Sequence, residues 1–98
     1  MTSKERAYLR SQAMMMEPIL NIGKSSVTPE LTDAVDEALE ARELIKISVL
    51  QNCLDDVREL AETLAGRTRS SVVQVIGKKI VLYRPSKFVE KRRYQLPR

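Results

Sequence analysis

The stretch Ile22-Gly23-Lys24-Ser25-Ser26-Val27-Thr28-Pro29-Glu30 decides the fold, because it joins an apolar, strand-like segment to the start of a helix through a short cationic loop. Thr28 is a favoured N-cap residue, and proline is favoured at the first helical position after it. The lysine, the small residues beside it and the positive end of the helix dipole all favour an anion. The sequence therefore predicts an anion-binding loop made of Gly23, Lys24, Ser25 and Ser26.

Part of this loop resembles a nucleotide-binding P-loop, which ends in Gly-Lys-Ser or Gly-Lys-Thr. The first glycine of that motif would fall on Pro18, which has no backbone N–H and a fixed φ, so the usual cradle of amides cannot form. Nucleotide hydrolysis through Lys24 and Ser25 would require tight magnesium–nucleotide binding, which calorimetry would detect. Two other interpretations of the loop remain. It is only a connection between a strand and a helix, or it contacts the backbone of a nucleic acid.

Outside this junction, hydrophobic periodicity and turn signals predict two further helices and three further strands. Helices are expected from a Thr2 capping box to Met15 or Met16, from Thr28 to Arg42, and from Asp55-Asp56 to a Gly66 C-cap. Strands are expected at residues 19–22, 44–50, 71–76 and 79–83, with a Gly-first hairpin turn at residues 77–78.

This order of elements, α-β-α-β-α-β-β, predicts a single compact two-layer α/β domain over residues 1–86 with a four-stranded mixed sheet and three helices. Three helices are too few to cover both faces of such a sheet, so part of one face or edge is expected to stay open. Residues 87–98 form a basic C-terminal tail, and the sequence leaves open whether this tail folds.

The composition argues against several classes of protein. No apolar run approaches the roughly 18 residues of a membrane span, and the N-terminus lacks a secretory signal, so a cytoplasmic protein without membrane contact is expected. The 98 residues include no histidine and a single cysteine, Cys53, which argues against a zinc site, a disulfide and general acid–base catalysis. We expect a monomeric protein that is not an enzyme and needs no cofactor.

The charges are unevenly distributed along the chain, whose net charge is +4. Residues 28–66 carry ten acidic and three basic side chains, whereas residues 78–98 carry eight basic side chains and one acidic one. The N-terminal segment adds Lys4, Arg6 and Arg10 to the basic set. Such a dipolar protein would orient itself on a polyanion.

Three blocks of the sequence, in this order, resemble the bacterial YhbY-type, CRM-domain family of RNA-binding proteins. The blocks are Thr2-Ser3-Lys4-Glu5-Arg6-Ala7-Tyr8-Leu9-Arg10, Leu39-Glu40-Ala41-Arg42-Glu43-Leu44-Ile45-Lys46-Ile47 and Val73-Gln74-Val75-Ile76-Gly77-Lys78-Lys79-Ile80-Val81-Leu82-Tyr83-Arg84-Pro85. The resemblance implies a fold like the C-terminal domain of bacterial translation initiation factor three. It also implies binding to precursor large-subunit ribosomal RNA during ribosome biogenesis.

Members of this family usually carry a Gly-x-x-Gly loop, likened to that of KH domains, at the position of Gly23-Lys24-Ser25-Ser26. Ser26 stands here at the second glycine. If the loop needs a positive φ at that position, a serine costs about 1–2 kcal/mol or shifts the loop slightly.

The main hypothesis is therefore binding of an RNA backbone without catalysis. The candidate RNA-binding residues are Gly23, Lys24, Ser25, Ser26, Lys4, Arg6, Arg10, Lys78, Lys79 and Arg84. The alternative is a protein adaptor whose acidic helices bind a basic ribosomal protein. DNA also stays open, because phosphate attraction alone does not distinguish it from RNA.

Overall fold

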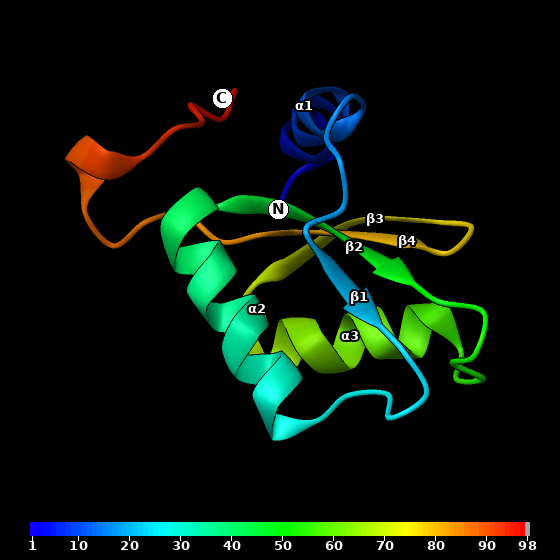
Figure 1. The fold of residues 1–98 in the computed structure, drawn as a ribbon. Helices are drawn as coiled ribbons and strands as arrows, with labels where there is room; N and C mark the ends of the chain where they lie inside the picture. The colour runs from blue at the N-terminus through cyan, green and yellow to red at the C-terminus, as the bar shows by residue number, and fades with distance from the viewer. Residues whose placement is uncertain (98) are drawn as a thin grey trace.

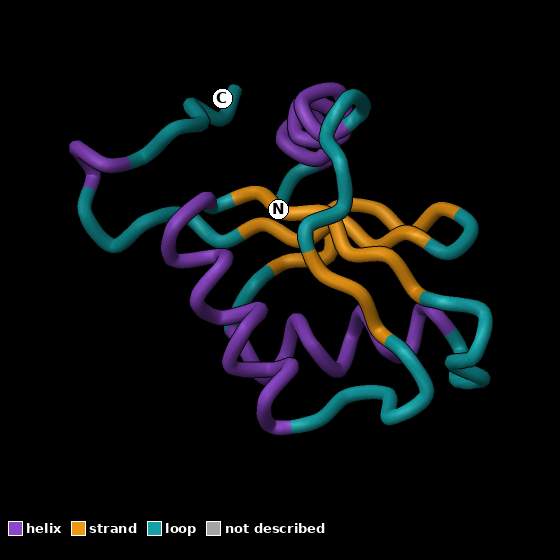
Figure 2. The backbone as a smooth tube through the Cα atoms, viewed as in Figure 1, coloured by secondary structure: helices purple, strands orange, loops and turns teal. Residues whose placement is uncertain are grey.

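The computed structural model describes residues 1–97, and its helices and strands follow the predicted order (Figures 1 and 2). The elements are α1 (Ser3–Ala13), β1 (Leu20–Ile22), α2 (Pro29–Arg42), β2 (Leu44–Val49), α3 (Val57–Thr68), β3 (Ser71–Ile76), β4 (Lys79–Tyr83) and the short 3-10 helix η1 (Val89–Lys91). Of the helices within residues 1–97, none has the length and apolar character needed to cross a membrane.

The four strands form one mixed sheet, as predicted, and their order in the sheet is β1-β2-β4-β3. β1 and β2 are parallel because α2 carries the chain back between them, whereas β4 is antiparallel to both β2 and β3. The β3–β4 turn is tight, and its first residue, Gly77, has a φ of +55°, a conformation that glycine adopts without steric cost. A register shift between Val72 and Gln74 interrupts the β3–β4 ladder.

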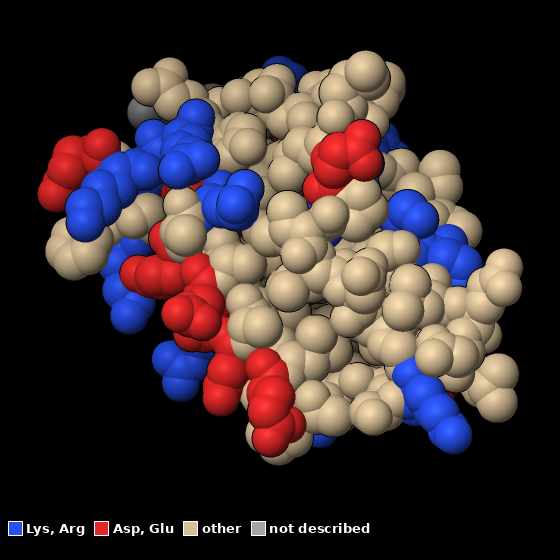
Figure 3. Space-filling view, viewed as in Figure 1, with Lys and Arg blue, Asp and Glu red and all other residues tan. Residues whose placement is uncertain are grey.

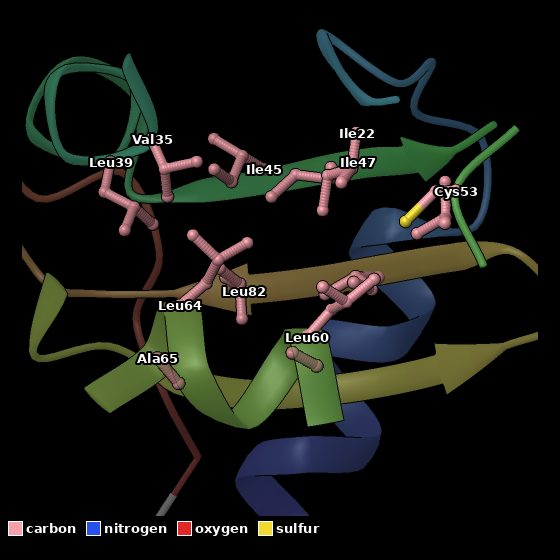
Figure 4. Packing of buried hydrophobic residues seen from close by; sticks show 13 residues of the cluster. Ile22, Val35, Leu39, Ile45, Ile47, Cys53, Leu60, Leu64, Ala65 and Leu82 are labelled. Carbon is pink, nitrogen blue, oxygen red and sulfur yellow. The ribbon is translucent and has the colours of Figure 1, made fainter. Parts of the chain in front are cut away.

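α2 and α3 pack together on one face of the sheet and bury the main hydrophobic core (Figure 4). Ile45 and Ile47 of β2 and Leu82 of β4 point into this core, because alternate residues of a strand share a face. These helices and the sheet make the two predicted layers.

α1 lies on the opposite face of the sheet and adds a partial third layer (Figure 1). Its Leu9 and Ala13 pack on Leu44, Val81 and Tyr83. The helix covers only part of this face. Beyond it, Ile76 is 58% exposed, so the face stays partly open as predicted.

α3 continues past Gly66, so the prediction of a C-cap at that glycine is wrong. The helix ends at Thr68, whose buried hydroxyl donates to the Leu64 carbonyl, and Arg69 caps it with a φ of +56°. Ala65 and Thr68 are buried, and packing of this last turn outweighs the roughly 1 kcal/mol that an internal glycine costs. At the other end of the chain, α1 stops at Ala13, earlier than predicted.

The C-terminal tail returns to the sheet and is held there by one buried carboxylate (Figure 1). Glu43, at the end of α2, accepts hydrogen bonds from the backbone N–H groups of Ser86 and Arg93. Tyr94 then meets the Tyr83 ring edge-on, with ring centroids 6.3 Å apart. The last residue of the predicted tail, Arg98, lies outside the described residues.

Candidate nucleic-acid interface

Three connecting segments meet at one end of the sheet, which we call the loop end. They are residues 23–28 after β1, residues 50–56 after β2, and residues 77–78 between β3 and β4. They meet because the parallel strands β1 and β2 finish at the same end, and the antiparallel pairing brings the hairpin turn to that end as well.

Backbone hydrogen bonds hold the three segments together. The Leu50 N–H donates to the Ile22 carbonyl at 2.8 Å, and the Val49 N–H donates to the Lys78 carbonyl at 2.7 Å. Ser48 is also the cross-strand partner of Lys79. The loop after β1 and the hairpin turn are thus both anchored to the end of β2.

The predicted anion loop forms a tight turn with two exposed residues at its tip, Lys24 and Ser25. The Ser26 N–H closes the turn by donating to the Gly23 carbonyl at 3.0 Å. Ser26 has a φ of +59°, in the left-handed region that favours glycine. The structure therefore has the positive φ that the Gly-x-x-Gly comparison anticipated, at a residue with a side chain.

The helix start after the loop is also as predicted. Pro29 is the first helical residue, and the Thr28 hydroxyl accepts a hydrogen bond from the Leu31 N–H at 3.0 Å. This cap fixes the direction in which α2 leaves the loop.

Asn52 is a loop-end residue that the sequence reasoning missed. A Cβ atom built on Gly23 would lie 3.7 Å from the Asn52 side-chain oxygen and 3.8 Å from a methyl carbon of Leu50. These are ordinary contact distances, so the amide of Asn52 lies directly beside the anion loop. No repeat or charge pattern marks this asparagine, because its position depends on the β1–β2 pairing.

The two lysines of the hairpin take different positions. Lys78 is exposed in the turn, and the Lys79 ammonium donates to the Ser48 hydroxyl at 3.2 Å. Lys79 therefore lies over the face of the sheet that carries α1. The predicted residues Gly23, Lys24, Ser25, Ser26, Lys78 and Lys79 all belong to the loop end.

Arg10 lies further along the α1 face. It lines a hollow of about 440 Å³ together with Lys46, Gln74, Ile76 and other α1 residues. Lys46 was also missed as a site candidate. The alternation of β2 does contain the signal, since Lys46 falls between Ile45 and Ile47 and must point to the α1 face.

Arg6 is not brought to the loop. It lines a hollow at the outer edge of β3 with Arg58 and Glu62, whereas Lys24 follows β1, the strand at the other edge of the sheet. Lys4 is exposed in the first turn of the same helix as Arg6. The predicted set is thus divided between the loop end and the outer edge of β3, and Arg10 lies on the α1 face.

Arg84 lies at the opposite end of the sheet, after the last residue of β4. Its guanidinium pairs with Asp36 at 2.6 Å and Glu40 at 3.0 Å, and it donates to the Thr68 carbonyl at 2.7 Å. Its side chain is only 17% exposed. The structure does not support RNA contact by Arg84, because two carboxylates of α2 already neutralise its charge.

Comparison with known proteins shows to which family this chain belongs. Residues 1–84 match the CRS1/YhbY (CRM) domain. The chain belongs to the CRM-domain family. The similarity to the "Probable RNA-binding protein YqeI" of Bacillus subtilis is 47% identity over 97 residues, 99% of each chain. A protein of Haemophilus influenzae named "RNA-binding protein" is 30% identical over 98 residues, which are 100% of this chain and 96% of the relative.

A solved structure agrees with this CRM domain over nearly its whole length. The solution structure of SAV1595 from Staphylococcus aureus, described as a hypothetical protein and candidate RNA binder, has a TM-score of 0.81 and 49% sequence identity. The alignment covers 99% of each chain. SAV1595 thus shares the fold of this chain, and all three relatives carry descriptions that refer to RNA binding.

Proposed function

We propose that this CRM-domain protein binds RNA through the phosphate backbone, using the loop end as its contact surface. The observation that carries the proposal is the pair of backbone hydrogen bonds that anchor the anion loop and the hairpin turn to the end of β2. They bring Lys24 and Lys78, which are far apart in the chain, to one end of the fold. Lysine and serine side chains are common partners of phosphate oxygens.

The surface extends from the loop end along the α1 face. Lys79, Lys46 and Arg10 continue the positive charge there. A neighbouring asparagine, Asn52, and the exposed hydroxyl of Ser25 add hydrogen-bonding groups without charge. This arrangement binds and orients RNA, and it contains no histidine for acid–base chemistry.

The sequence has four aromatic residues, few for stacking on unpaired bases, so we infer recognition of backbone and shape in structured RNA. We further propose precursor large-subunit ribosomal RNA as the target, during ribosome biogenesis in the cytoplasm. The family membership supports this role. Crosslinking in cell extract, followed by sequencing of the bound RNA, tests it directly: recovery of unrelated transcripts in place of ribosomal precursors would contradict the proposed target.

The salt dependence of RNA affinity tests the contact surface. With a single-stranded RNA as the probe, four to six phosphate contacts give a slope of about −3 to −4 in log affinity against log salt, at about 0.7 per contact. The double variant Lys24→Gln, Lys78→Gln should lower affinity and reduce the slope by about 1.4.

Arg42→Gln provides the control, since Arg42 is an exposed cation at the far end of α2. It should leave both affinity and slope nearly unchanged. An effect of Arg42→Gln equal to that of Lys24→Gln alone would mean that net charge, and not the loop end, governs binding.

The acidic side of α2 supports a second candidate, a protein adaptor for a basic ribosomal protein. Figure 3 shows a continuous acidic stripe over this helix. Asp36 and Glu40 in this stripe are engaged by Arg84, so reversing their charge would also disturb the fold. Asp33→Lys and Glu37→Lys are the cleaner test. Loss of particle association in these variants, with RNA binding intact, would favour the adaptor.

A further inference from the structure

A second group of cations surrounds a hollow at the opposite end of the sheet, which we call the tail end. The hollow has a volume of about 460 Å³. Its lining residues come from α2, from the end of α3 and from the chain after β4. The basic ones are Arg67, Arg69, Arg84 and Lys87, and the acidic ones are Asp36 and Glu40.

The charges in this hollow do not cancel. Arg84 is paired with both carboxylates and holds them within hydrogen-bond distance. Arg67, Arg69 and Lys87 are exposed at the rim. The following tail adds Lys91, Arg92 and Arg93 against Glu90 at this end of the chain. Figure 3 accordingly shows basic side chains on both sides of the acidic stripe.

Arg69 has a backbone conformation that its residue type does not favour. It caps α3 in the left-handed region, with φ +56° and ψ +41°, where glycine is the usual residue. A non-glycine residue there costs about 1–2 kcal/mol. The fold needs the left-handed turn but not the guanidinium, which points to a role for the charge outside the folding of the chain.

We propose that the tail-end hollow binds a second segment of RNA phosphate backbone, so that the domain bridges two stretches of RNA. The choice of RNA as the ligand rests on the proposed function, and the second site is new. β2, with six residues, separates the two ends by about 17 Å. This exceeds the Debye length of about 8 Å at physiological salt, so the ends attract phosphate independently of one another.

Titration of the isotope-labelled full chain with diuridylate, followed by NMR, distinguishes the two sites. This dinucleotide is too short to occupy both ends at once. We expect resonances of the loop end and of the tail end to shift along separate saturation curves. The triple variant Arg67→Gln, Arg69→Asn, Lys87→Gln should abolish only the tail-end shifts. The loop-end variant Lys24→Gln, Lys78→Gln should abolish only the loop-end shifts.

The other outcomes decide between the proposals. Shifts confined to the loop end would overturn the bridging site and leave the proposed function intact. Shifts confined to the tail end would overturn the assigned contact surface and bridging together. An absence of shifts at both ends would overturn RNA binding itself.

Single substitutions of Arg69 distinguish the effect of its charge on binding from its effect on the fold. Asparagine tolerates the left-handed conformation, so Arg69→Asn should keep or raise the melting temperature while weakening tail-end binding severalfold, and Arg69→Lys should keep the binding. Energy transfer between two differently labelled RNAs measures bridging in the same proteins. We expect it with the wild type and not with the triple variant. Undiminished energy transfer in that variant, with its melting temperature unchanged, would overturn the proposal.

Discussion

Replacing Ser26 by glycine should stabilise this protein, although glycine loosens the unfolded chain. Ser26 has a φ of +59°, and a left-handed L-residue costs about 1–2 kcal/mol, which glycine does not incur. Glycine also makes the unfolded chain more flexible, which reduces this gain in unfolding free energy by about 0.4–1 kcal/mol. Subtracting the two ranges gives a net gain between about 0 and about 1.6 kcal/mol, and the middle value of about 0.8 kcal/mol corresponds to several degrees in melting temperature for a domain of this size.

Ser25→Gly is the matched control, since it lies one residue earlier in the same turn. The left-handed residues other than glycine in residues 1–97 are Ser26, Glu43 and Arg69, so Ser25 has no such strain to lose. Ser25→Gly should therefore lower the unfolding free energy only through the greater flexibility of the unfolded chain. Because that effect is common to both variants, their difference of about 1–2 kcal/mol isolates the strain at Ser26.

Urea unfolding, monitored by circular dichroism, measures the change in unfolding free energy of both variants. It is obtained from the shift in the transition midpoint when the dependence of unfolding free energy on urea is unchanged. Equal destabilisation by the two glycines would refute the reasoning, because it would mean that Ser26 is unstrained in solution. The RNA affinity of Ser26→Gly should stay close to wild type, since Lys24 and the closing Ser26-to-Gly23 hydrogen bond are retained.

Three further changes test the packing around the site. Glu43→Gln should cost about 1.5–3 kcal/mol in urea unfolding, because an amide has one acceptor for the two N–H groups of Ser86 and Arg93; an unchanged midpoint would contradict this. Thr28→Ala should cost about 1 kcal/mol through loss of the α2 cap, measured by thermal melting, and a change below a few tenths would count against the cap. Burial, and then the nearby Glu43 carboxylate, raise the pKa of Tyr83 above its ordinary value of 10.0. Its contribution to stability is therefore complete below about pH 10 and is lost as the pH rises through the folded pKa, and Tyr83→Phe should flatten that decline in unfolding free energy.

Much of the chain could be read from local patterns. The start of α2 at Pro29 follows from capping chemistry, and the hairpin at Gly77 follows from turn chemistry. Both depend on neighbours in the chain, so the sequence alone was sufficient. The end of α3 could not be predicted this way, because burial of Ala65 and Thr68 in the last turn outweighs the local preference of Gly66 to end the helix.

The candidate site also has a part that local sequence predicts and a part that depends on the tertiary structure. The sequence by itself determined that residues 23–26 form a cationic turn before a helix. Only the tertiary structure decided which charges share a surface: strand pairing joins the anion loop to Lys78, and an ion pair across 48 residues withdraws Arg84 into a contact with Asp36. Local conformation depends on steric and hydrogen-bonding preferences of adjacent residues. The grouping of distant charges depends on which strands pair and which faces are buried, and these are settled by the packing of the whole chain.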